Sequence, residues 1–151
     1  MTRFDFYHLQ KSTLDQILPK LCEKAYNAGQ RVHILVGNEA RVEFINSLLW
    51  TYNEEAFLPH GSKKDGFSDM QPIFISSVLE NLNNASLLIL VDGAMPEISA
   101  LTEYERVLNI FDGNDEFALD RARTYWKDIK SNAGELHYWQ QNSSGIFEQK
   151  M

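Results

Sequence analysis

Residues 29–61 read GQRVHILVGNEARVEFINSLLWTYNEEAFLPHG, and this stretch decides the fold. Its first part holds a largely aliphatic run over 32–36, which is typical of a strand buried on both faces of a sheet. Gly37 closes the run, and Asn38 is predicted to cap the next helix, because apolar residues recur at helical spacing over 42–49. A strand, a tight turn, an amphipathic helix and a return loop form half of a βαβ crossover.

Strands and helices alternate along the rest of the chain. Short apolar or alternating runs predict further strands over residues 3–9, 72–76, 87–91 and 136–141. This order predicts an α/β fold, a three-layer, mostly parallel Rossmann-like sheet with helices on both faces. We expect one domain over 1–145 and a C-terminal tail at 146–151, with fraying from Asn142 onward.

Helices are predicted over 103–111 and 115–132, where apolar residues fall at helical spacing. Pro19 lacks the N–H that an interior helical position needs, so the first helix is predicted to begin at Pro19, after a short turn. Gly29 is predicted to cap its end. Residues 61–71 are polar and aperiodic, which indicates a surface loop.

Composition bounds the class of protein. The chain has 151 residues, of which 44% are hydrophobic and 23% charged, so it suits one globular domain. A formal net charge of −7 repels a phosphate backbone and disfavours direct binding to duplex DNA. A lone cysteine, Cys22, together with the lack of a signal peptide or a long apolar run, predicts a cytoplasmic protein without a membrane segment.

Signatures of catalysis are missing from the sequence. There is no Gly-rich phosphate loop, no pair of histidines at zinc-ligand spacing and no nucleophile elbow. Asp92 follows an apolar run as a magnesium-binding aspartate does, but Asp92-Gly93 is more typical of a turn. We expect no catalytic residue, metal or cofactor. The alternative is a small-molecule or nucleotide-binding α/β enzyme with a site near Gly37 and Asp92, at the carboxyl ends of the strands.

The late helix, DEFALDRARTYWKDIKSNAG over 115–134, carries the candidate binding site. At ~100° per residue, one flank gathers apolar and basic side chains: Leu119, Arg123, Trp126 and Lys130, with Lys127 further out. In one interpretation the tryptophan covers the core while the basic side chains extend to water. In the other, Arg123 and Lys130 hold a peptide carboxylate while Trp126 and Leu119 receive an apolar side chain.

A second candidate surface follows the central helix. Trp50 lies at the predicted helix end, and Phe57, Leu58 and Pro59 form an apolar loop after it. Such a group is usually part of the core, but tryptophan is also enriched at interface hot spots.

Four ordered features carry a resemblance to a known family. They are the Phe6-Tyr7 strand, the AGxRVxIL pattern over 28–35, a helix ending in Leu-Leu-Trp, and Phe-Leu-Pro-His over 57–60. In combination the chain resembles the chi subunit of bacterial DNA polymerase III over most of its length. The resemblance implies a non-catalytic accessory subunit of DNA replication, which bridges the clamp loader to single-stranded-DNA-binding protein and meets DNA only indirectly.

The resemblance also implies roles for residues. Chi subunits bind the acidic, phenylalanine-terminated tail of single-stranded-DNA-binding protein with a basic and aromatic patch, and Arg123 and Trp126 match its spacing. Leu119 stands where some relatives have a basic residue, and one residue is inserted before Gly134, which predicts weaker electrostatic capture. The region of Trp50 and 57–59 is expected to dock the psi subunit, which links chi to the clamp loader.

Overall fold

The computed structural model describes residues 2–53, 57–132 and 134–151, and it confirms the predicted α/β class. Its strands are β1 (Arg3–Leu9), β2 (Val32–Val36), β3 (Gly61–Ser62), β4 (Ile73–Ser76), β5 (Leu87–Val91), β6 (Arg106–Asp112), β7 (Glu135–Gln141) and β8 (Phe147–Gln149). The α-helices in the same part of the chain are α1 (Leu14–Asn27), α2 (Ala40–Thr51) and α3 (Glu116–Ser131). All strands join one sheet in the order β3-β4-β2-β5-β6-β1-β7-β8.

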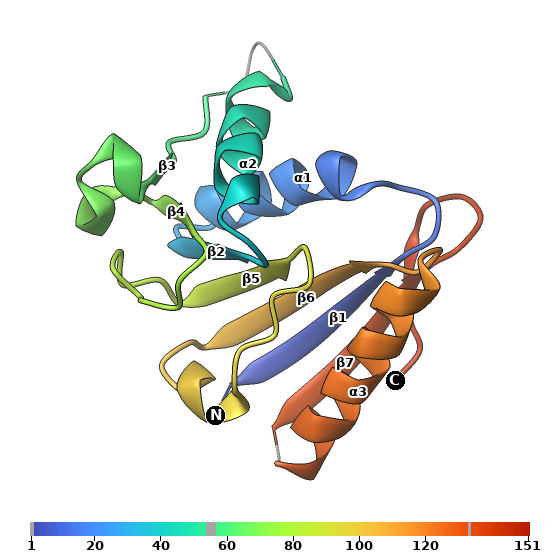
Figure 1. Ribbon diagram of the computed structural model, residues 1–151. Coiled ribbons are helices and arrows are strands. Elements are labelled where there is room, and N and C mark those ends of the chain that lie inside the picture. The colour runs from blue at the N-terminus through green and yellow to red at the C-terminus, as the bar shows by residue number, and fades with distance from the viewer. Residues whose placement is uncertain (1, 54–56, 133) are drawn as a thin grey trace.

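The sheet is the middle of three layers. Helices α1 and α2 cover one face and α3 covers the other, as Figure 1 shows. Every strand pair is parallel except β7 with β8. All five residues of β2 are buried, which confirms a strand with covered faces. Among the described residues, α3 is therefore the α-helix that covers its face of the sheet, over β6, β1 and β7.

The prediction of a helix over 103–111 is wrong, because most of this segment belongs to β6, which lies between β1 and β5. Residues 107–111 are all buried, including Asn109, since helices cover both faces of a central strand. A strand buried on both faces has no alternating pattern, and a short apolar run fits helical spacing equally well.

The predicted start of the first helix at Pro19 is also wrong. Helix α1 begins at Leu14, and the side-chain oxygen of Gln16 accepts a hydrogen bond from the Thr13 N–H at 3.0 Å. This cap starts the helix a turn earlier and leaves a buried Pro19 inside it. The predicted end is confirmed: Gly29 has a φ of 79°, and its N–H donates to the Tyr26 carbonyl.

Asn38 does not cap α2. The N-cap position is Glu39, which makes no side-chain cap bond, and Asn38 contributes only its backbone carbonyl, to the Arg41 N–H. The polar segment predicted as a loop holds β3 and two short 3-10 turns, Lys63–Asp65 and Ser68–Met70.

The prediction that the tail frays from Asn142 onward is wrong. Residues 147–149 form β8, antiparallel to β7, and the Phe147 ring lies edge-on to Tyr7 at 5.1 Å. Gln141 fixes the start of this hairpin, because its side-chain oxygen accepts the backbone N–H groups of residues 10–12. Among the described residues, none of the helices has the length and apolar character needed to cross a membrane.

Candidate functional site

Helix α3 presents the predicted binding flank in a fixed orientation. Asp115 is its N-cap, and its side chain accepts hydrogen bonds from the N–H groups of Phe117 and Ala118, at 3.0 and 3.3 Å. The residues that face the sheet are buried: Ala122, Tyr125 and Ile129. With this face packed, the flank that holds Arg123 and Trp126 lies along the boundary between α3 and β7.

Trp126 is half-buried rather than sealed inside the core. Its ring meets Phe6 edge-on at 5.3 Å and Tyr138, from β7, at 5.4 Å. Leu119 is also half-buried on the same flank and packs against the same cluster. Trp126 and Leu119 form an apolar surface. Phe6 and Tyr138 support the Trp126 ring from the sheet, and the outer side of the surface is accessible to solvent.

Arg123 is exposed beside this surface, with 65% of its side chain accessible. Its ion-pair partner is Asp120, one turn away at 3.8 Å and 78% exposed, and such pairs contribute little. Lys127 and Lys130 are exposed on the same helix. The guanidinium is therefore available to a ligand.

The charge of Arg123 reaches the neighbouring strands. Burial lowers the pKa of His8 below its ordinary value, and Arg123 lowers it further. Burial raises the pKa of Tyr138, while Arg123 acts in the opposite direction. His8 Nδ1 and the Tyr138 hydroxyl lie 2.7 Å apart, so the two groups form a part-buried polar base under the flank.

Sequence reasoning missed Tyr138 at this boundary and the backbone of Lys150 that pairs with it. Successive residues of β7 point to opposite faces of the sheet, and this period of two could have placed Tyr138 on the α3 side, since Trp139 lies on the other face against Tyr7. Lys150 follows β8, and its N–H donates to the Tyr138 carbonyl at 2.8 Å. It was missed because the tail was expected to fray. We define the α3 flank as Leu119, Arg123, Trp126, Lys127, Lys130 and Tyr138.

The second predicted surface divides into exposed and buried parts. Trp50 is 54% exposed and Phe57 is 74% exposed, with ring centroids 6.4 Å apart. Leu58 is 2% exposed and belongs to the core under α2, while Pro59 is partly buried. The loop between Trp50 and Phe57 includes residues 54–56, which lie outside the described part of the chain.

His60 supports this second surface. Its two ring nitrogens lie 2.6 Å from the Leu58 carbonyl oxygen and 3.0 Å from the Asn46 carbonyl oxygen. Its ring centroid is 4.6 Å from that of Trp50. The buried histidine therefore joins the loop to α2 and holds Trp50 at the surface.

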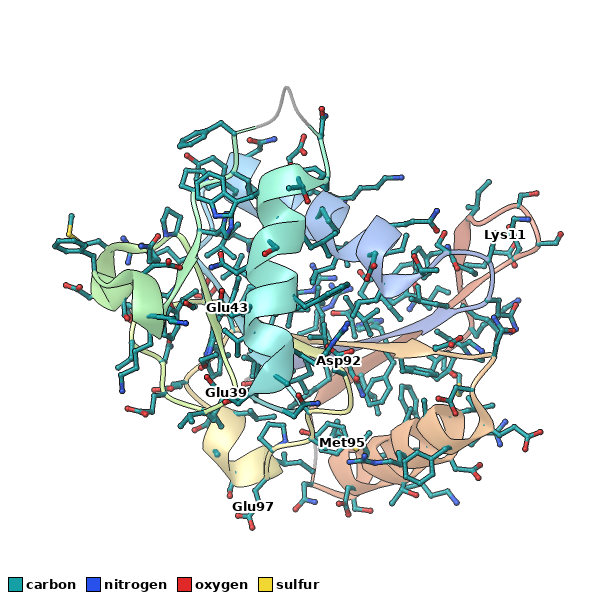
Figure 2. The ribbon with its side chains drawn as sticks, turned by 45° about the horizontal axis from the view of Figure 1, so that its top comes forward. Lys11, Glu39, Glu43, Asp92, Met95 and Glu97 are labelled. Carbon is teal, nitrogen blue, oxygen red and sulfur yellow. The ribbon has the colours of Figure 1, made fainter. Side chains whose placement is uncertain are left out.

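The alternative site near Gly37 and Asp92 is closely packed. A Cβ placed on Gly37 would lie 1.9 Å from the Asp92 carbonyl oxygen, so the two backbones touch. The Asp92 carboxylate accepts a hydrogen bond from Arg41 Nε at 2.9 Å, at the foot of α2 (Figure 2).

A hollow of about 490 Å³ lies beside this alternative site, at the carboxyl ends of β1, β5 and β6. Two further carboxylates line it, and both already accept backbone N–H groups: Asp112 from Asn114, and Asp115 from the start of α3. The described residues contain no cluster of three or more His, Cys, Asp or Glu placed to hold a metal.

Comparison with known proteins gives the family. The model of the family described as "DNA polymerase III chi subunit, HolC" matches residues 1–137. Over 111 residues, 74% of this chain, the sequence is 32% identical to a probable DNA polymerase III subunit chi of Rickettsia prowazekii (strain Madrid E). Over 63 residues, 40% of this chain, it is 36% identical to the DNA polymerase III subunit chi of Pseudomonas aeruginosa PAO1.

The matched stretches span 66% of the Rickettsia protein and 44% of the Pseudomonas protein, less than two thirds of either. The family match nevertheless covers most of the chain, and it includes the central strand, α2 and all of α3. The predicted resemblance is confirmed, and the chain belongs to the DNA polymerase III chi subunit family.

Proposed function

We propose that the chain is a non-catalytic accessory subunit that bridges the clamp loader, through psi, to the C-terminal tail of single-stranded-DNA-binding protein. The observation that supports this most is the pairing of an exposed Arg123 with a half-buried Trp126 on one flank of α3. A free cation next to a supported aromatic ring suits the end of a peptide that carries both a carboxylate and a large apolar side chain.

The roles on the α3 flank follow from its chemistry. Arg123 pairs with the terminal carboxylate, because a guanidinium binds a carboxylate through two parallel hydrogen bonds. Trp126 and Leu119 receive the terminal phenylalanine ring. Lys127 and Lys130 attract the acidic residues that precede it. A net charge of −7 keeps the rest of the surface away from nucleic acid, so contact with DNA is indirect.

Psi docks on the second surface, with Trp50 and Phe57 as exposed anchors and Leu58 and Pro59 as the supporting loop. A large aromatic side chain that stays exposed in the free chain is typical of an interface hot spot. Holding two partners on one domain raises their effective local concentration, so neither contact has to be strong.

The test is tail-peptide binding by calorimetry with Arg123→Ala. We expect a loss of at least tenfold in affinity for an acidic peptide ending in Pro-Phe, about 1.4 kcal/mol. Lys20→Ala, an exposed cation on α1, is the matched control and should leave the affinity unchanged. A peptide without its last phenylalanine should bind weakly to every variant. Unaltered binding by Arg123→Ala would contradict the assignment.

The hollow beside Asp92 supports a nucleotide or other small molecule as a second candidate ligand. Thermal denaturation with ATP, GTP and NAD separates the two functions. An accessory subunit should show no rise in melting temperature, since the carboxylates around the hollow already have partners within the chain. A clear rise with any one of the three would favour the enzyme instead.

A further inference from the structure

The opposite flank of α3 borders a second, larger hollow. It measures about 980 Å³ and lies between the helix and the segment over 95–102. Phe4, Leu101 and Tyr125 are buried and form its floor. Figure 2 shows Met95 close to α3, and Glu97 on the segment that makes the opposite wall. We call this hollow the acidic groove.

The walls of the groove are held together by hydrogen bonds. The Tyr125 hydroxyl donates to the Pro96 carbonyl at 2.7 Å, which joins the helix to the loop wall. Arg121 Nη2 donates to the Gly93 carbonyl at 3.2 Å, and the Thr2 hydroxyl donates to the Tyr104 carbonyl at 2.7 Å. A groove that is already fixed in the free chain loses little conformational entropy when it binds a partner.

The charge of the groove is negative. Among the described residues that line it, three are acidic, Glu97, Asp120 and Asp128, and one is basic, Arg121; Asp120 also forms the weak, exposed ion pair with Arg123. Arg121 is already engaged by the Gly93 carbonyl and lies 5.6 Å from the centre of the Phe117 ring. Asp120 and Asp128 are eight residues apart on α3, or roughly 12 Å along the helix axis. The groove therefore offers acids on both walls to a cation.

Apolar side chains lie between these charges. Phe117 is 70% exposed at one end of the groove, and Met95 and Ile98 are half-buried in the loop wall. An exposed aromatic side chain beside a rigid apolar floor is the usual composition of an interface hot spot.

We propose that the acidic groove binds a basic amphipathic helix of a partner protein. The apolar face of that helix packs on the floor and on Phe117, and its lysine or arginine side chains pair with Asp120, Asp128 and Glu97. Two basic residues about two turns apart match the spacing of the aspartates. Nucleic acid and anionic membranes carry the same sign of charge as the groove and are repelled from it.

This occupant differs in charge from the acidic tail proposed for the α3 flank. One helix thus sorts two partners by charge: Arg123 accepts an anionic segment, and Asp128, with Glu97 on the loop wall, accepts a cationic one, while Asp120 lines the groove and pairs with Arg123. The two sites adjoin at the Asp120–Arg123 ion pair, which is exposed and contributes little, so it does not prevent either contact.

The test uses the full chain, labelled with ¹⁵N, and a 15-residue helical peptide of leucine and lysine. We expect amide shift changes concentrated over 95–102 and 117–128. The exposed double variant Glu97→Gln with Asp128→Asn, which leaves the Asp120–Arg123 pair intact, should weaken binding at least tenfold, and so should Phe117→Ala. The control pair is Glu39→Gln with Glu43→Gln, which removes the same charge from the exposed start of α2 (Figure 2) and should leave binding unchanged.

Two results would overturn the proposal. Equal weakening by both double variants, or shift changes spread over the whole surface, would show only general attraction to an acidic protein. Equally tight binding of a peptide of the same composition, with its leucines scattered around the helix, would show that the apolar floor takes no part.

Discussion

Asp5 is a carboxylate buried in the middle of the sheet. It accepts hydrogen bonds from Arg3 and Arg106, at 2.9 and 2.8 Å, and from Trp139 Nε1 at 2.9 Å. Burial alone would raise the pKa of Asp5, but these hydrogen bonds outweigh it and hold the pKa below its ordinary value. The group joins β1 to β6 and β7, whereas the sequence pattern predicted only a strand over 3–9.

His33 predicts how stability depends on pH. It is fully buried in β2, with its ring nitrogens 2.9 Å from the Tyr104 hydroxyl and 2.7 Å from the Ser76 hydroxyl. Burial lowers the pKa of His33 from 6.5 to about 4. Between these values the unfolded chain binds a proton that the folded chain does not, so stability falls with falling pH, by at most about 1.4 kcal/mol per pH unit.

The measurement is urea unfolding from pH 4.5 to 7.5, for the natural chain and for His33→Gln. For the natural chain, His33 should add no pH dependence to the free energy of unfolding above pH 6.5, and it should lower that free energy as the pH falls below 6.5. The free energy of unfolding of the variant should fall less steeply with falling pH. It should still fall somewhat, because the pKa of His8 is also lowered. Identical slopes for the two proteins would contradict this account of His33.

At the scale of elements, the sequence correctly predicted the strands and helices whose apolar residues follow a clear pattern. The strands over 32–36 and 87–91 and the helix α3 were placed correctly, because apolar runs mark the strands and helical spacing of apolar residues marks the helix. It misplaced β6, since a strand covered on both faces carries no period of its own. It misplaced the start of α1, because the cap from Thr13 and Gln16 outweighs one missing N–H at Pro19.

The same distinction applies to the α3 flank. Helical periodicity brought Arg123 and Trp126 to one side of the helix, and the structure places them there. Tyr138 comes from β7, which meets α3 only through the order of the sheet, and Lys150 follows β8 and reaches Tyr138 through a backbone hydrogen bond. Contacts of this kind depend on strand pairing over long distances in the sequence, which a local pattern does not contain.

β8 gives the prediction at this scale. Phe147 packs edge-on against Tyr7, and the strand covers the edge of β7. Phe147→Ala should lower the free energy of unfolding by roughly 2 kcal/mol, less than the 3–5 kcal/mol of a fully buried phenylalanine. The amide of Tyr138, which donates to the Met151 carbonyl, should exchange faster with solvent. Ile146→Ala, at a side chain that is 62% exposed, is the control and should change stability little. A Tyr138 amide that exchanges as before would mean that β8 adds nothing to β7.

At the scale of the whole molecule, the sheet separates the two proposed docking surfaces. The second surface adjoins the end of α2, which holds Trp50, whereas the α3 flank lies over the opposite face of the sheet, as the positions of α2 and α3 in Figure 1 show. Leu58, at the second surface, belongs to the apolar cluster on one face of the sheet, whereas Leu119, Trp126 and Tyr138 pack against the cluster on the other face. Among the described residues, the two surfaces have no helix in common. A change at one surface therefore has to pass through the sheet to reach the other.

This separation predicts that the two contacts are energetically independent. Trp50→Ala should leave the affinity for the acidic tail peptide unchanged within twofold, although it removes the proposed anchor for psi. In the double variant Trp50→Ala with Arg123→Ala, the losses measured by calorimetry should add to within about 0.5 kcal/mol, as they do for distant sites without common partners. A coupling free energy above about 1 kcal/mol would instead require the sheet to have two arrangements that both partners bias. Such coupling would make the domain a switch, whereas additive losses are the behaviour of a rigid bridge.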